Sequence, residues 1–332
     1  MEMFQERYIG LRSQYIFPLK DYSIKYDKLN YNTIKEKLKT KIKNISIIGC
    51  KTYKIEFDKE DLVKGIIADS EFFFTRALVQ YTNIINADSD LSPCWMAVSQ
   101  YYFSYFTTTA LLRILSRGNL YLDGEIVKII SNMATLLIGE KIQIDTGNYI
   151  FSIKSEDELG NSKLGVYGDN VFMELKYNGS RGTHEQTWIS IQEFLEEYIR
   201  LDSSKNSEYT ILMSMKDIIN LYGATFPSKL RNQINYQAPY GYESINKQLQ
   251  CSNSSITREE LLRKICSFDK VNNDENYKLE YMYLYGRFFF ELLNKLFSEY
   301  YTRSSCNKKF YESKNDYFKE RNIDIKEFMN LT

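Results

Sequence analysis

Residues 93–117, PCWMAVSQYYFSYFTTTALLRILSR, are the stretch that decides the fold. As a helix, this stretch is apolar around most of its circumference, so it predicts a helix buried on several sides at the centre of a helical body. Ser92 is the expected N-cap, and Pro93 occupies the first turn, where a missing N–H costs nothing. Gly118 is the expected end of the helix.

Helical periodicity marks most of the surrounding chain. Residues 69–86 predict the preceding long helix, with Phe73, Ala77 and Tyr81 along one stripe. The chain has only 4 Pro in 332 residues, and this shortage of helix breakers favours long helices. Further helices are expected at 33–44, which has a basic flank, and at 125–138, 184–201, 207–222, 225–235, 257–267 and 274–302.

Strands are expected in two places. Residues 51–57, KTYKIEF, alternate in polarity and predict a strand. Residues 140–178 predict a small β insertion, with a hairpin over 141–153 that turns at Gly147-Asn148 and a strand over 171–177. The sequence thus predicts a mixed N-terminal segment (1–66), a helical body (67–302) that carries the insertion, and a charged C-terminal segment (303–332).

Composition limits the classes of function. The 43 Lys+Arg balance 43 Asp+Glu, which argues against a protein that coats nucleic acid by bulk charge but leaves room for a local basic patch. No apolar run reaches the length of about 18 residues that a membrane helix needs. The first 19 residues lack the pattern of a signal peptide, so neither feature is expected. The 5 Cys form no CxxC pair and predict free thiols in a reducing cytoplasm.

The familiar catalytic signatures are absent. The sequence has no P-loop, no GxGxxG after a strand and no GxSxG, and its single His excludes sites that need two; no cofactor is expected. Glu174-Leu175-Lys176 is the nearest approach to a nuclease-like Glu-x-Lys, because this spacing puts both side chains on one face of a strand. No convincing Asp precedes it. The alternative is an exposed cross-strand ion pair.

The central stretch resembles the second long helix of the HEPN superfamily, which carries a YYAxFxxxxALLxxxG-like pattern. The helix expected at 69–86 stands where that family's first helix should be, and the chain length is similar to that of the YaaC-like branch. The resemblance covers about 69–135 and 184–300, and implies a mainly α fold: a HEPN-like up-and-down helical bundle. The same spacing suits any close-packed helix pair, so a generic helical core is the alternative. The matching residues are Tyr101, Tyr102, Phe106, Ala110, Leu111, Leu112 and Gly118.

Active members of that family cleave RNA without a metal ion, using an Arg-x4–6-His motif late in the bundle. The resemblance implies that His moves a proton and that Arg stabilises the phosphorane charge. Here the counterpart is LRNQINY (230–236), which has no His where one is expected. Arg231, Asn232 and Tyr236, with Tyr240 in the following loop, predict a pocket that binds phosphate or stacks a base. The alternative is a structural helix end.

The single histidine, His184, lies in SRGTHEQTW (180–188), at the start of a predicted helix. A helix N-terminus disfavours the charged form of His, so one interpretation is a neutral His184 packed beside Trp188. The other hypothesis brings His184 close to Arg231 in space, which restores the Arg/His pair from a different chain position. In that case Arg181 adds a contact to phosphate.

Three functions follow. The first is a non-catalytic or degenerate HEPN-like subunit of a bacterial stress or anti-phage defence system. It would bind RNA, DNA or a partner protein, or pair with a second copy through its helices. The second is a metal-independent HEPN-type endoribonuclease toxin that uses Arg231 and His184. The third is a metal-dependent nuclease built on Glu174 and Lys176 of the β insertion. Because the late motif lacks its His, binding ranks first.

Overall fold

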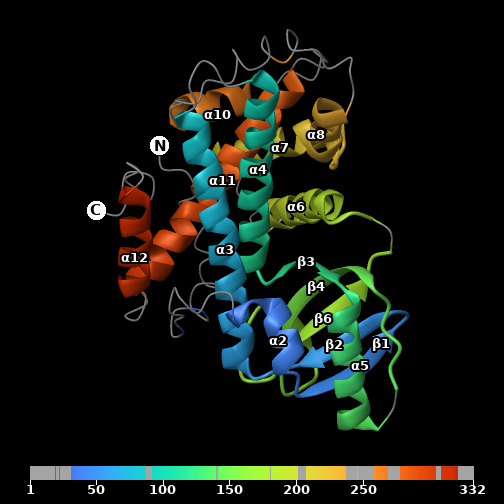
Figure 1. Ribbon diagram of the computed structural model, residues 1–332. Helices are drawn as coiled ribbons and strands as arrows, with labels where there is room; N and C mark the ends of the chain where they lie inside the picture. Colours follow the sequence, from blue (N-terminus) through green and yellow to red (C-terminus); the bar gives the residue numbers. More distant parts are fainter. Residues whose placement is uncertain are drawn as a thin grey trace. The chain divides into compact units, whose positions relative to one another are not determined.

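The computed structural model describes residues 19, 22, 31–86, 92–139, 141–179, 181–200, 207–236, 245, 258–267, 277–303 and 308–320. In this part the chain is mainly helical with a small antiparallel sheet (Figure 1), as the sequence predicts. The chain forms two compact units. Among the described residues, the helical unit comprises those within Phe73–Thr109 and Thr187–Leu293, and the sheet unit comprises those within Leu11–Phe72, Ala110–Gln186 and Asn294–Thr332.

The predicted helices are present, and apart from the start of α3 their ends shift by only a few residues. The central helix is α4 (Pro93–Ile114), and the preceding long helix is α3 (Lys59–Ile85). The last described helix, α12, lies in the charged C-terminal segment. The others are α2 (Ile34–Thr40), α5 (Gly124–Ile138), α6 (Thr183–Arg200), α7 (Ser207–Tyr222), α8 (Phe226–Tyr236), α10 (Arg258–Cys266), α11 (Lys278–Arg303) and α12 (Lys308–Lys319).

Helix α3 begins at Lys59 rather than at residue 69, so the predicted start was wrong. Gly65 lowers the helix propensity of this first part, which is why the pattern indicated a later start. In the structure Gly65 lies against α2, where an added Cβ would be 3.3 Å from Ile34 Cγ1. Tertiary packing between α2 and α3 therefore outweighs the local preference against helix.

Aromatic side chains fill the core of the helical unit. Phe103 of α4 packs against Phe290 of α11 with 5.2 Å between ring centroids, and Tyr81 of α3 lies 5.4 Å from each. Tyr101 of α4 and Tyr285 of α11 are also buried, and each lies beside Trp188 of α6. The prediction that the Tyr-rich helix is buried on several sides is confirmed.

The sheet contains six strands, all paired antiparallel, in the order β1-β2-β6-β4-β3, with β5 on the end of β4. The predicted strands at 51–57 and 171–177 are confirmed as β2 and β6. Because these two strands pair, the N-terminal strand and the predicted β insertion belong to one sheet. The strands are β1 (Asn44–Gly49), β2 (Thr52–Glu56), β3 (Arg117–Leu122), β4 (Gly147–Glu156), β5 (Ser162–Leu164) and β6 (Val171–Tyr177).

Two strand-level predictions were wrong. Gly118 does not follow the helix as a cap; α4 ends at Ile114, and Gly118 lies in β3 with φ +153°. The expected hairpin over 141–153 is absent, because β4 begins at Gly147 and pairs with β3 and β6 instead. In the sequence, Gly118 indicated a helix end and Gly147 a hairpin turn. In the structure both have positive φ, Gly118 inside β3 and Gly147 at the start of β4.

The two faces of the sheet differ in polarity. Along β4, burial alternates from residue to residue, which shows that one face is packed and the other partly exposed. Helix α5 contacts β1, β3 and α2. The other face carries charged side chains in cross-strand pairs, with Lys54 Nζ 2.5 Å from Glu156 Oε2 and Lys154 Nζ 2.6 Å from Glu174 Oε2.

Arg113 joins several elements of the sheet unit. Its Nε lies 3.3 Å from Asp69 Oδ2 of α3, and its Nη2 donates to the Asn119 carbonyl of β3 at 2.5 Å. Asp69 Oδ1 accepts the Ile34 N–H at the start of α2. Burial raises the pKa of the Asp69 carboxyl, and the Arg113 charge acts against this rise. The end of α4 is thus fixed by a buried ion pair.

A second buried ion pair holds helix α12. Lys314 Nζ lies 2.8 Å from Glu71 Oε2, and both side chains are almost fully inaccessible. The Tyr301 hydroxyl of α11 donates to the other Glu71 oxygen. Burial lowers the pKa of Lys314, although Glu71 favours its charged form. The charged C-terminal segment therefore contributes a docked helix to the sheet unit.

Within the described ranges, no helix has both the length and the apolar character that a membrane span requires. Cys50, Cys94 and Cys266 are free thiols, as predicted. Cys251 and Cys306 lie outside the described residues.

Candidate functional site

Arg231 of α8 has the most unusual surroundings of the predicted site residues. Pro227 stands in the first turn of α8, and the buried Leu230 and Ile234 fix which side of the helix packs. The Arg231 guanidinium carbon lies 5.6 Å from the Tyr101 ring centroid and 5.9 Å from that of Tyr102. These are cation–π distances, so two aromatic rings of α4 hold the guanidinium.

The hydrogen bonds of Arg231 are incomplete. Its Nη1 donates to Asn232 Oδ1 at 2.7 Å. Its Nε is buried and has no hydrogen-bond partner among the described residues. A buried donor without a partner costs about 1–3 kcal/mol, so the packing of Arg231 against the two rings has to offset this cost.

Exposed side chains continue this site along α8. Lys229, Asn232 and Tyr236 are exposed and fall at positions i, i+3 and i+7, which share one face of a helix. The Tyr236 side chain is 77% exposed, which is unusual for a large aromatic residue. We call Lys229, Arg231, Asn232 and Tyr236 the α8 surface. It offers two cations, an amide and an aromatic ring.

Tyr101 is one of the two rings that hold Arg231. In the sequence it stands out only as part of the family resemblance. Tyr101 is fully buried, and its ring lies 6.2 Å from that of Trp188. Burial raises the pKa of Tyr101 well above its ordinary value, outweighing the nearby Arg231 charge. Its phenol therefore stays neutral and positions Arg231 rather than moving a proton.

The other predicted site residues are placed as follows. Tyr240 lies outside the described residues. Arg181 is exposed, and His184 is half-buried in the first turn of α6. Both belong to the sheet unit, whereas Arg231 belongs to the helical unit. The pairing of His184 with Arg231 stays a prediction.

The Glu-x-Lys pair of β6 has the predicted orientation. Glu174 and Lys176 both lie on the partly exposed face of the sheet, and Glu174 forms a cross-strand ion pair with Lys154. Across the described segments of the chain, no three His, Cys, Asp or Glu side chains gather closely enough to hold a metal ion. The described contact of Glu174 is thus the ion pair that was the alternative interpretation.

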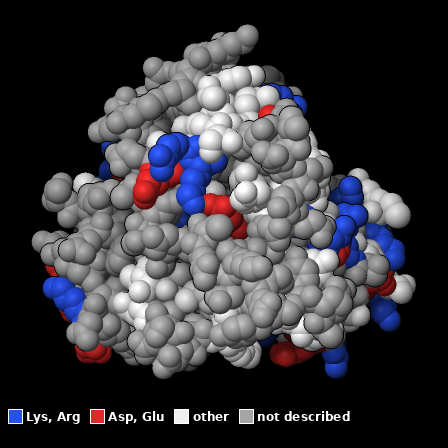
Figure 2. Space-filling view, turned by 90° about the horizontal axis from the view of Figure 1, so that it is seen from above, with Lys and Arg blue, Asp and Glu red and all other residues white. Residues whose placement is uncertain are grey.

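Charged side chains are mixed rather than segregated on the face drawn in Figure 2. Lys and Arg lie beside Asp and Glu there, as far as the described residues show. This fits the balanced composition of the chain. Binding of a charged ligand would therefore depend on local arrangements such as the α8 surface.

Comparisons of this chain with protein-family models, curated proteins and solved structures give no match.

Proposed function

We propose that this protein is a non-catalytic, HEPN-like helical subunit of a bacterial stress or anti-phage defence system, and that it binds single-stranded RNA through the α8 surface. The observation that carries the proposal is Arg231, a partly exposed cation that two tyrosine rings hold beside the exposed Asn232. A phosphate oxygen is an acceptor that suits a guanidinium fixed in this way.

The rest of the α8 surface supports a single-stranded ligand. Tyr236 presents an exposed ring on which a base can stack, and Lys229 adds a positive charge on the same helix face. Proteins that bind single strands combine aromatic platforms with cations along the backbone path. Asn232 supplies an amide that can bond to a base edge.

Binding is favoured over cleavage by the residues in α8. Metal-independent cleavage needs a group that accepts and returns a proton, and α8 has Asn235 and Tyr236 where the family has His. The HEPN assignment and the link to defence are supported by the resemblance of α4. A helical partner protein, or a second copy, remains the alternative ligand for this class of fold.

The experiment is fluorescence anisotropy with a labelled oligouridylate of about 12 nucleotides, a length within single-strand site sizes. We expect Tyr236→Ala to weaken binding about 5- to 100-fold through lost stacking. Lys229→Ala should lower the salt slope by about 0.7. The matched control is Tyr121→Ala, which removes another exposed tyrosine, on β3 (49% exposed). Equal binding by all three variants would overturn the proposal, as would no binding at low salt.

The same samples separate the alternatives. The matching deoxyoligonucleotide tests the preference for RNA over DNA. Gel electrophoresis of the RNA after incubation in EDTA tests cleavage. Cleavage that His184→Ala abolishes would replace the binding proposal with the metal-independent ribonuclease, and cleavage only with Mg²⁺ would point to Glu174 and Lys176 instead.

A further inference from the structure

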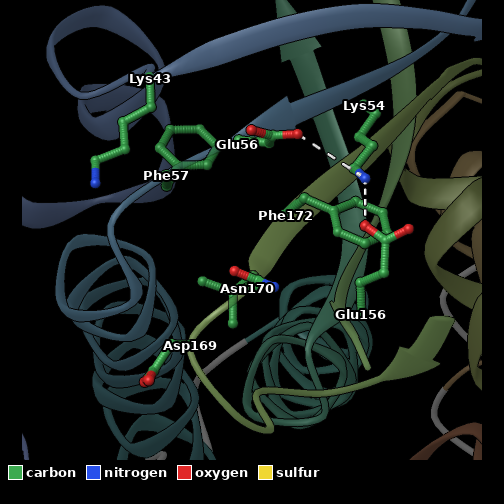
Figure 3. Close-up of a pocket in the computed structure, with 9 residues that line it drawn as sticks. Lys43, Lys54, Glu56, Phe57, Glu156, Asp169, Asn170 and Phe172 are labelled. Carbon is green, nitrogen blue, oxygen red and sulfur yellow. Dashed lines mark hydrogen bonds and ion pairs between the residues drawn. The ribbon is translucent and has the colours of Figure 1, made fainter. Parts of the chain in front are cut away.

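A pocket of about 420 Å³ opens at one end of the sheet, within the sheet unit (Figure 3). This volume falls in the range of about 300–1,000 Å³ that small-molecule sites occupy. The pocket lies where β2 and β4 end, where β1 and β6 begin, and where the loop before β6 passes. Its walls are Lys43, Lys54, Glu56, Phe57, Glu156, Asp169, Asn170, Val171 and Phe172.

Phe57 and Phe172 give the pocket apolar walls, because both are only 4% exposed and yet line it. The Lys54 ammonium lies 4.5 Å from the Phe172 ring centroid. Figure 3 shows this ammonium between two carboxylates, Glu156 at 2.5 Å and Glu56 at 3.9 Å. The pocket therefore already surrounds one alkylammonium with an aromatic face and two acids, the arrangement that recognises organic cations.

Access to these groups is unequal. The Lys54 side chain is 21% exposed, whereas Glu156 is 32% exposed, Glu56 41% and Asp169 100%. The other lysine of the pocket, Lys43, pairs with Asp58 outside the lining. An incoming ligand thus meets carboxylates more readily than the Lys54 ammonium.

Glu56 has spare capacity to accept hydrogen bonds. A carboxylate has about four acceptor positions. The two side-chain partners of Glu56 lie at long distances for an ion pair and a hydrogen bond: Lys54 Nζ at 3.9 Å and Asn44 Nδ2 at 3.4 Å. Glu156, in contrast, already accepts from Lys54 at 2.5 Å. Glu56 is therefore the carboxylate best able to take a new ammonium.

We propose that this pocket binds a small aliphatic diamine. One ammonium would lie at Glu56, the carbon chain would cover Phe57, and the second ammonium would reach Asp169. A divalent metal ion fits less well, because Lys54 lies between Glu56 and Glu156 and no metal-binding cluster occurs among the described residues. Putrescine and succinate each contain four carbon atoms, so they serve as probes of similar length and opposite charge.

The test is isothermal titration calorimetry of the full chain at low ionic strength. We expect putrescine to bind and succinate not to bind. Glu56→Gln should weaken putrescine binding at least tenfold. The matched control is Glu60→Gln, which removes an exposed carboxylate of α3 that pairs with Lys64 outside the pocket. Control and pocket variants with equal affinity would overturn the proposal.

Lys54→Met provides a test with an opposite sign. Methionine can still cover Phe172, but it frees Glu56 and Glu156 from their internal cation. Putrescine should then bind more tightly than to the unchanged protein. Weaker putrescine binding by Lys54→Met would contradict the diamine. Succinate binding that this variant loses would show an anion site built on Lys54 and would contradict it too. Thermal melts of each variant confirm that the fold is intact.

Discussion

Gly286 of α11 and Ser104 of α4 are in backbone-to-backbone contact. A Cβ added at residue 286 would lie 2.1 Å from Ser104 Oγ and 2.8 Å from Ser104 Cα. The Ser104 hydroxyl lies 3.0 Å from the carbonyl of Met282, one turn before Gly286. Two long helices of the helical unit therefore meet at a point where only glycine fits.

Gly286→Ala should destabilise the protein by about 3 kcal/mol or more, because the clash is with a Cα that no rotamer change can move. Urea denaturation followed by circular dichroism measures the loss. Gly182→Ala is the control, since nothing lies within 4 Å of its added Cβ. A loss at residue 286 no larger than that of the control would contradict the contact.

Arg113→Met removes the cation that pairs with the buried Asp69. We expect a loss of about 3–5 kcal/mol near neutral pH, since a buried charge is left without its partner. Without Arg113 the pKa of Asp69 rises further, so the folded state of the variant binds a proton that the unfolded state releases. Stability of the variant should then fall as the pH rises from about 4, where unfolded Asp titrates.

Denaturation curves of Arg113→Met at about pH 5 and about pH 8 check the sign. The deficit relative to the unchanged protein should be smaller at the lower pH. Asp69→Asn in the Arg113→Met background should remove this pH dependence. An equal deficit at both pH values would show that Asp69 is not the titrating group.

Two buried tyrosines predict opposite effects of losing a hydroxyl. The Tyr285 hydroxyl is buried without a hydrogen-bond partner among the described residues, so Tyr285→Phe should be neutral or stabilise by up to about 1 kcal/mol. The Tyr149 hydroxyl donates to the Asp145 carbonyl at 2.7 Å, so Tyr149→Phe should cost about 1 kcal/mol. Thermal melts of both variants make the comparison.

The buried Tyr285 hydroxyl also predicts how stability depends on pH. Burial raises the pKa of Tyr285 well above its ordinary value. The contribution of the buried Tyr285 phenol to the free energy of unfolding is fully present below the pKa of Tyr in the unfolded chain, near 10. It is lost as the pH rises above that value. In denaturation curves above about pH 10, Tyr285→Phe should reduce the fall in stability by up to about 1.4 kcal/mol per pH unit. An unchanged slope would mean that Tyr285 ionises as readily folded as unfolded.

The sequence predicts the helices well and the site poorly, for physical reasons. The position of α4 is readable because Pro93 begins it and apolar side chains cover it all round. Strand β3 is not readable, because Gly118 looks like a helix end until Phe151 of β4 is seen beside it. Periodicity reports local structure, and these errors arise where a distant strand determines the conformation.

Arg231 and Tyr236 were predicted as candidate binding residues, because the segment 230–236 resembles an Arg…His motif that lacks its His. The support that Tyr101 and Tyr102 give to Arg231 was not predictable, since α4 and α8 are far apart in the chain. Lys54, Glu56 and Glu156 carry no motif either. Their meeting depends on the pairing of β2 and β4 with β6, which no spacing within one segment reveals.

The Lys314–Glu71 ion pair has a consequence for biosynthesis. Glu71 leaves the ribosome 243 residues ahead of its cation, Lys314 of α12. Until Lys314 emerges, closing the sheet unit would bury the Glu71 carboxylate without its cation, at a cost of about 3–5 kcal/mol. Completion of this unit therefore waits until α12 has been made, and chains that terminate before α12 should be removed by cellular proteases.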